Sequence, residues 1–173
     1  KLIMTPAARI AAVLEILADM QAASEAGTLL GRQAGQWLRA GLQRRRYAGS
    51  GDRAAVGDLF WKIQRGRARL GWHLASIGAS ANPRNITLAM LVLMEQKFAV
   101  LPQLFSAEIA HAPAPLDDRE LALVAMLETR DFNDPAMPEH TALEWPEWLI
   151  ADAKAGLGDG LARELAALMT EAP

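Results

Sequence analysis

Cysteine is absent from the 173 residues, which excludes a disulfide scaffold, a thiol nucleophile and any cysteine-ligated zinc or iron–sulfur site. The three histidines, His73, His111 and His140, are too far apart to show metal-ligand spacing. The longest apolar run, around Leu88–Leu93, is far below the roughly 20 residues that span a bilayer. No signal-peptide pattern opens the chain. We therefore expect a cytoplasmic protein with neither a metal nor a membrane as partner.

Catalytic patterns are equally scarce. No run of alternating apolar and polar residues predicts a strand, so a nucleotide-binding loop between a strand and a helix is absent. Asp117, Asp118 and Glu120 have the positions of helix-start residues rather than of an acid–base pair. No serine stands near a histidine in a recognisable arrangement. The sequence predicts a binding or accessory domain and not an enzyme that works alone.

Opposite charges are concentrated in different parts of the chain, although the formal net charge is only −2. Residues 1–105 contain 14 Lys and Arg against 6 Asp and Glu, whereas residues 106–173 contain 4 against 14. Most of the cations fall between Arg32 and Trp72, with only Asp52 and Asp58 to oppose them. This stretch favours a polyanion or an acidic protein surface as partner, or else it is a solvated face balanced by the acidic last third.

Nearly every segment has the periodicity of a helix. Thr5 and Pro6 are residue types that begin a helix, and we expect this first helix to end near Gly27. Further helices are predicted over residues 28–47, from Ser50 or Asp52 to about 77, over 84–98, after Pro102, from 117, over 145–155 and around Leu161–Leu168. The helix over 84–98 is apolar nearly all round, which predicts a place at the centre of a bundle.

The helix expected to end near residue 77 has an unusual outer side. At about 100° per residue its apolar positions gather on one face, and Trp61, Arg65, Arg69 and Trp72 fall on the opposite face beside Lys62. Three explanations stay open. The indoles stack on unpaired bases while the cations hold phosphates, or they dock onto another domain or chain, or other helices of the same domain cover them.

Four arginines are predicted to surround one helix junction. Arg44, Arg45 and Arg46 close the second helix, and Arg53 follows the turn at residues 49–51. Cations at a helix C-terminus complement its dipole, which accounts for one or two of them. Because guanidinium groups bind phosphate in a bidentate way, contact with an RNA backbone is the alternative. Arginines at 32, 39 and 46 also recur every seven residues and so share one outer stripe.

The order of several short motifs resembles the N-terminal region of bacterial Sun-type (RsmB-like) rRNA cytosine-5 methyltransferases. Gly51–Phe60, with Arg65–Arg69 behind it, is similar to the family's D-R-A-x-V-x-D-L-v-y-x-x-x-R-r segment. Met4–Arg9 looks like the start of such proteins. Trp145–Leu149 is similar to the P-x-W-L element before their methyltransferase domain, and Met169–Pro173 to the stretch that leads into it. The likeness covers most of the chain.

This resemblance implies an all-α, NusB-like helical bundle over residues 1–130 and a helical connector over residues 131–173. In the family a catalytic domain follows that binds S-adenosylmethionine and uses two cysteines. The present sequence has no cysteine and no cofactor loop, and it stops where that domain would begin. We therefore expect an N-terminal fragment with no catalytic, cofactor-binding or metal-binding residue. S-adenosylmethionine is expected only in the missing domain.

The expected function is RNA binding that orients rRNA, with rRNA and the family's methyltransferase domain in cis as partners. The candidate RNA contacts are Arg44, Arg45, Arg46, Arg53, Lys62, Arg65 and Arg69, with Trp61 and Trp72 as stacking or docking residues. A protein-interaction scaffold and a free-standing NusB-like regulator of transcription antitermination are the alternatives.

Overall fold

The computed structural model describes residues 3–28, 33–160, 163–164 and 167, and within them the regular elements are all helices. The all-α class predicted from the sequence is therefore confirmed. No helix in this part of the chain is long and apolar enough to span a membrane. The helices are α1 (Pro6–Glu25), α2 (Ala34–Arg44), α3 (Ser50–Arg65), α4 (Arg67–Ser76), α5 (Pro83–Leu93), α6 (Leu101–Leu104), α7 (Asp118–Glu128), α8 (Glu139–Ala142) and α9 (Glu147–Leu157), with 3-10 turns at Phe98–Val100 and Gly158–Gly160.

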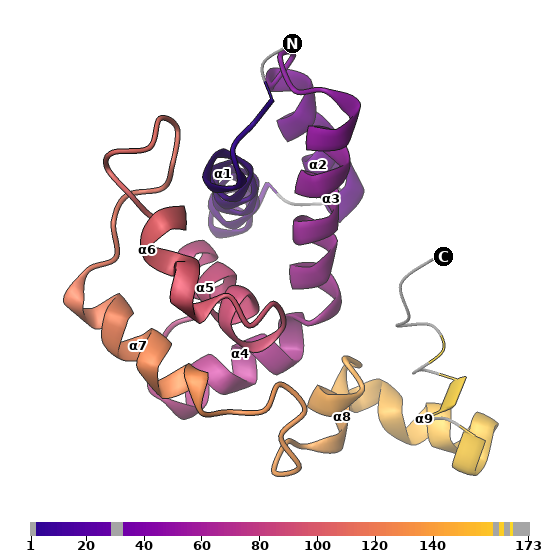
Figure 1. Ribbon diagram of the computed structural model, residues 1–173. Coiled ribbons are helices and arrows are strands. Elements are labelled where there is room, and N and C mark those ends of the chain that lie inside the picture. The colour runs from indigo at the N-terminus through magenta and orange to yellow at the C-terminus, as the bar shows by residue number, and fades with distance from the viewer. Residues whose placement is uncertain (1–2, 29–32, 161–162, 165–166, 168–173) are drawn as a thin grey trace.

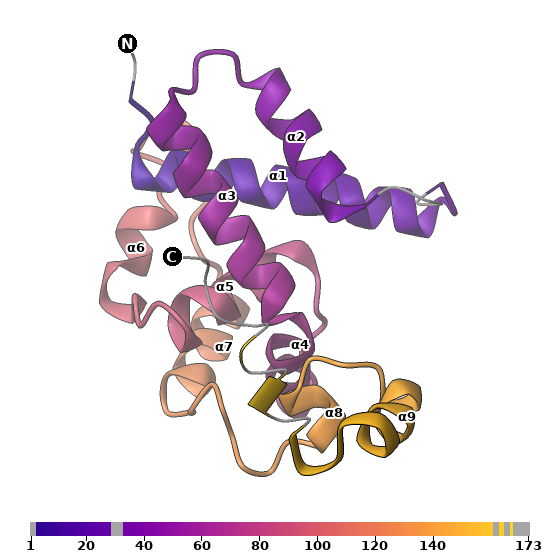
Figure 2. The same cartoon turned by 90° about the vertical axis from the view of Figure 1, so that its right-hand side faces the viewer.

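Helix α1 lies in the middle of the bundle (Figure 1). It contacts α2 and α3 on one side and α5 and α6 on another. Helix α4 continues from the end of α3 and packs against α5, while α7 covers the outer side of α5 (Figures 1 and 2). Helices α8 and α9 extend below α4, and α8 contacts it. This arrangement leaves α2 and α3 with one side turned away from the rest of the bundle.

The core forms around α5, as its apolar sequence predicts. All residues from Ile86 to Leu93 are buried, and the helix contacts α1, α3, α4 and α7. Phe60 of α3 and Ile16 of α1 are among the large side chains that pack into the same core. Full burial of one such side chain stabilises the fold by about 1.5–3 kcal/mol relative to exposure.

Three helix starts follow local rules that the sequence shows. Thr5 Oγ1 accepts a hydrogen bond from the Ala8 amide at 3.1 Å, and Asn82 caps α5 in the same way. At α7, Asp117 Oδ1 accepts from the Glu120 amide at 2.8 Å, and Glu120 Oε2 accepts from the Asp117 amide at 3.0 Å. Each of these bonds satisfies an amide that the first turn of a helix leaves unpaired.

A carboxylate from the start of α3 also fixes the beginning of the chain. Asp52 is buried, and its Oδ1 accepts from the Met4 amide at 3.2 Å and from Arg9 Nη2 at 2.9 Å. Burial works to raise the pKa of Asp52, but the bonds from Arg9 and from the Met4 and Gly49 amides outweigh it and hold the pKa below its ordinary value. The charged side chain therefore connects α1 to α3.

The second helix is shorter than the sequence predicts. It begins at Ala34 instead of near residue 28 and ends at Arg44 instead of near residue 47. It approaches α1 closely at Gly41, where an added Cβ would lie 2.3 Å from Ile16 Cγ1. The two helices can pack at this distance because Gly41 has no side chain.

The single helix predicted up to residue 77 is wrong, because the chain breaks at Gly66 into α3 and α4. An added Cβ at Gly66 would lie 3.1 Å from Phe132 Cζ, so the segment after α7 packs closely on the break. In an unbroken helix the amides of Ala68 and Arg69 would donate to carbonyls four residues earlier. Here both amides donate to the Glu144 carboxylate, at 2.7 and 3.0 Å. Glu144 thus caps α4 from a distant part of the chain.

The C-terminal part of the chain packs on α4 through residues that follow α7. Residues 132–144 pack on α4 through Phe132 and Glu144, and the domain boundary near residue 130 stays a prediction. The last predicted helix, around Leu161–Leu168, has its core positions outside the described residues.

Candidate nucleic-acid interface

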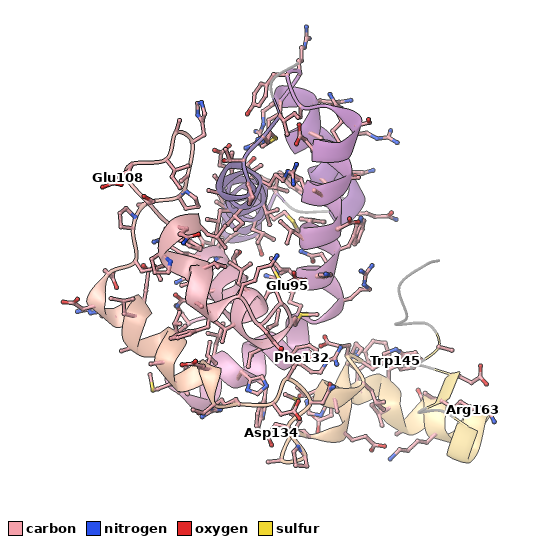
Figure 3. The ribbon with its side chains drawn as sticks, in the orientation of Figure 1. Glu95, Glu108, Phe132, Asp134, Trp145 and Arg163 are labelled. Carbon is pink, nitrogen blue, oxygen red and sulfur yellow. The ribbon has the colours of Figure 1, made fainter. Side chains whose placement is uncertain are left out.

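Helices α2 and α3 form an antiparallel hairpin. Gly57 lies opposite Leu38, and Gly35 lies opposite Trp61. A Cβ added at either glycine would be in van der Waals contact with the side chain across from it. The side facing α1 is buried, and the other side carries exposed residues at helical spacing. Figure 3 shows several nitrogen-tipped side chains that project from α2 and α3 away from α1. We call the following exposed residues the hairpin face: Gln36, Arg39, Gln43, Ala54, Asp58 and Trp61, with Arg46 and Tyr47 in the turn.

Two of the predicted RNA contacts are paired with acids of α1. Arg44 forms an ion pair with Asp19, and its side chain keeps 58% of its exposure. Arg45 forms an ion pair with Glu15 and donates to the Gly41 carbonyl at 2.9 Å, with only 8% of its side chain exposed. Arg45 therefore holds α2 against α1, whereas Arg44 still presents a charge at the surface.

Lys62 is also paired within the fold. Its ammonium group contacts the Glu95 carboxylate, which Lys97 approaches from the other side at 3.0 Å. Burial works to raise the pKa of Glu95, but the hydrogen bonds from Lys62 and Lys97 outweigh it and lower the pKa. Glu95 thus stays charged and fixes Lys62 to the end of α5. Arg65, in the last turn of α3, is half-buried.

Arg69 fastens the segment after α7 to α4. Its Nε donates to Glu144 Oε1 at 2.9 Å, and its Nη1 donates to Asn133 Oδ1 at 2.8 Å. The guanidinium carbon also lies 4.2 Å from the centroid of the Phe132 ring, which Figure 3 labels beside α4. With these three partners, Arg69 acts within the fold instead of offering its charge to a phosphate.

The remaining predicted arginines, Arg46 and Arg53, have no acidic partner among the described residues. Arg46 is exposed, and Arg53 Nε donates to the Ala48 carbonyl at 3.1 Å. Arg39 and Arg67 are also exposed without an acidic partner among the described residues, and neither is among the predicted RNA contacts. The predicted stripe of arginines at seven-residue spacing does not continue from Arg39 to Arg46, because α2 ends at Arg44 and Arg46 lies in the turn. The third member of that stripe, Arg32, lies outside the described residues.

The predicted stripe of two tryptophans and two arginines does not form. The break at Gly66 separates Trp61 and Arg65 on α3 from Arg69 and Trp72 on α4. A helical wheel assumes one straight axis, so its prediction fails beyond the break. Of these four residues only Trp61 belongs to the hairpin face.

The two indoles have different environments. Trp61 is 37% exposed, and its ring stands edge-on to Phe60 with the centroids 5.3 Å apart. Trp72 is half-buried and stands edge-on to His73 at 5.1 Å. Because Trp61 is held by its neighbours and still reaches solvent, it is the better placed of the two for contact with a partner.

His73 is fully buried beneath the segment after α7. Its Nε2 lies 3.3 Å from the Phe132 carbonyl oxygen, and its Nδ1 has no hydrogen-bond partner. Burial lowers the pKa of His73. The imidazole therefore favours its neutral form, in which Nε2 donates to Phe132.

Acidification from pH 7 to pH 5 should weaken the fold through His73. The unfolded chain takes up a proton near pH 6.5, whereas the folded chain resists protonation until its lower pKa is reached, so stability falls across that window. Urea unfolding at several pH values measures this slope. His73→Gln should remove it, and an equal slope in the variant would show that other groups cause it.

Among the residues that the structure describes, no three His, Asp or Glu side chains are placed to hold a metal ion. The hairpin face instead combines exposed arginines, amides and aromatic rings, which are residue types that bind phosphate and stack on bases.

Comparisons with known proteins do not place the chain in a family. No protein-family model matches it, and neither a curated protein nor a solved structure matches it. The likeness to Sun-type methyltransferases is therefore supported only by the short sequence motifs, whereas the hairpin face is defined by exposed residues in the structure.

Proposed function

We propose that this chain is an RNA-binding domain whose hairpin face contacts the backbone of rRNA. By its resemblance to Sun-type proteins, it would orient the RNA for an S-adenosylmethionine-dependent methyltransferase domain in cis. The chain itself would supply no catalytic or cofactor-binding residue.

The observation that carries this proposal is the unbalanced charge of the hairpin face. Arg39 and Arg46 are exposed without an acidic partner among the described residues, and the half-buried Arg53 adds a third cation without an acidic partner next to the turn. Asp58 is the one acid of the face, because Asp52 is buried and paired with Arg9. Guanidinium groups without an acidic partner are suited to bind the phosphates of a polyanion.

The aromatic residues of the same face favour RNA over a featureless polyanion. Tyr47 is 58% exposed and Trp61 37%, and both lie among the cations. Unpaired bases stack on such rings, whereas phosphate-rich polymers without bases gain nothing from them.

The salt dependence of RNA binding tests the proposal. With three phosphates contacted, the slope of log affinity on log salt should be about −2 for a single-stranded oligonucleotide. Arg39→Glu and Arg46→Glu should each weaken binding for all sequences alike and reduce that slope by about 0.7. Fluorescence anisotropy of a labelled 20-nucleotide RNA measures both quantities.

Arg119→Glu is the matched control, because Arg119 is exposed on α7 and makes the same change in net charge. Figure 1 places α7 on the opposite side of the bundle from α2 and α3. An equal loss in this control would mean that the overall charge matters and the hairpin face does not. Absence of RNA binding at low salt would contradict the proposal outright.

A docking function is the second candidate, and it uses a different surface. Trp148 on α9 is 74% exposed and belongs to the Trp145–Leu149 motif. A tryptophan so exposed is a suitable anchor for a protein interface, here with the methyltransferase domain in cis. Trp148→Ala should abolish such docking and leave RNA affinity unchanged.

A further inference from the structure

A groove opens beside the hairpin turn, where α1 begins. Its volume is about 840 Å³, within the range of small-molecule sites. Helix α1 lines one side with Ala8, Ala11 and Leu14. The loop between α6 and α7 lines the other with Ala110 and Pro113. Figure 3 labels Glu108 on this loop, which stands apart from α1 at the edge of the bundle. The α1 side of the groove is therefore lined by small and apolar side chains.

Polar groups line this groove along the loop between α6 and α7, where Arg84 and His111 stand, and at the end nearest the hairpin turn. The Arg45 guanidinium lies there with Glu15 as its partner, and Thr5 adds a hydroxyl group. Glu15 keeps 68% of its side-chain exposure, so its carboxylate can accept further hydrogen bonds. An occupant would thus meet the apolar side chains of α1 on one side, and donors and acceptors near the hairpin turn and along the loop.

An aromatic ring lines the same end of the groove, and an exposed cation precedes it in the chain. Tyr47 lines the groove and is 58% exposed, so its ring is accessible to an occupant. Its chain neighbour Arg46 is exposed and has no acidic partner among the described residues. A group that stacks on Tyr47 would therefore place an attached phosphate within the field of Arg46.

We propose that this groove binds an unpaired nucleobase of the RNA that follows the hairpin face. A base has two flat apolar faces and a polar edge, which matches the apolar α1 wall and the polar groups around it, and its phosphate is suited to Arg46. An alkyl chain would form no hydrogen bond with the exposed Glu15 carboxylate, whereas the donors on the edge of a base can do so. Since bases inside a duplex cannot reach the groove, the site selects single-stranded RNA. This inference rests on the proposed RNA-binding function and gives it a substrate class.

Two variants test the site from opposite directions. Tyr47→Ala removes the stacking ring, and Ala11→Leu fills the groove from a half-buried position on α1. Each should weaken binding of a single-stranded RNA 20-mer by about tenfold and leave binding of a duplex of the same length unchanged. Tyr47→Phe keeps the ring and should bind like the unaltered chain. Thermal unfolding of each variant shows whether the fold is intact.

The outcomes separate this inference from the function on which it rests. If both variants bind single-stranded RNA normally while Arg46→Glu does not, the nucleobase site is wrong and the hairpin face stands. Equal losses for duplex and single strand would also overturn the site, because a base inside a duplex cannot enter it. If the unaltered chain binds no RNA at low salt, the proposed function and the nucleobase site fail together.

Discussion

Gly41→Ala should destabilise the protein by about 1–3 kcal/mol, although helix propensity alone predicts a gain of about 1 kcal/mol. The added Cβ would lie 2.3 Å from Ile16 Cγ1 and 2.7 Å from Ile16 Cδ1. Ile16 is 1% exposed and packed in the core, so it has little room to move. Either α2 shifts away from α1 or Ile16 adopts a strained rotamer, and both cost more than the gain in helix propensity.

Gly35→Ala provides the control within the same helix. An added Cβ there lies 3.7 Å from Trp61 Cζ2, an ordinary contact, so this variant should be neutral or more stable by up to about 1 kcal/mol. Urea unfolding compares the two variants. Gly41→Ala should cost less in an Ile16→Ala background, because the Cγ1 and Cδ1 atoms that the added Cβ would approach are absent there. If Gly41→Ala were as stable as Gly35→Ala, the close approach of α1 and α2 would be refuted.

The parts of the fold that the sequence predicts well depend on neighbouring residues. Thr5, Asn82 and the Asp117–Glu120 pair cap helices through bonds to amides only three residues away. The burial of α5 likewise follows from a segment that has no wide polar face. These signals lie within one or two helical turns, so a single sequence contains all the information they need.

The break between α3 and α4 could not be predicted in this way. Gly66 gave a weak signal, since an isolated glycine is tolerated in a helix at a cost of about 1 kcal/mol. Two distant residues stabilise the break: Phe132 packs on Gly66, and the Glu144 carboxylate caps α4. Both residues are more than 60 positions away in the chain, so only the three-dimensional contact explains the break.

The same limit applies to the candidate site. Composition locates the surplus of arginine correctly in the first two thirds of the chain. Composition cannot predict that Arg45 pairs with Glu15 and Lys62 with Glu95, because those acids lie in distant parts of the chain. Pairing removes such cations from the set available to a polyanion, and the exposed arginines of the hairpin face are what remains.

Glu144→Ala should release α8 from α4 while the bundle stays folded. The Glu144 side chain is 5% exposed and accepts from the Ala68 amide, the Arg69 amide and Arg69 Nε. Charge-assisted hydrogen bonds of this kind contribute about 1.5–3 kcal/mol each, and their loss leaves two helix-start amides unpaired. Amide hydrogen exchange should then accelerate on the order of a hundredfold for Ala68, for Arg69 and for α8.

Two further variants assign that effect to the carboxylate. Glu144 has φ of 56°, a left-handed conformation that glycine adopts without strain, so Glu144→Gly removes the carboxylate and relieves the backbone. If Glu144→Gly exchanges as fast as Glu144→Ala, the lost hydrogen bonds are the cause. Asn133→Ala removes a single bond to Arg69 and should have a much smaller effect, since the two α4 amides keep their partner. Unchanged exchange in Glu144→Ala would mean that the contacts of Phe132 and Asn133 hold the segment after α7, and that the cap on α4 has no energetic role.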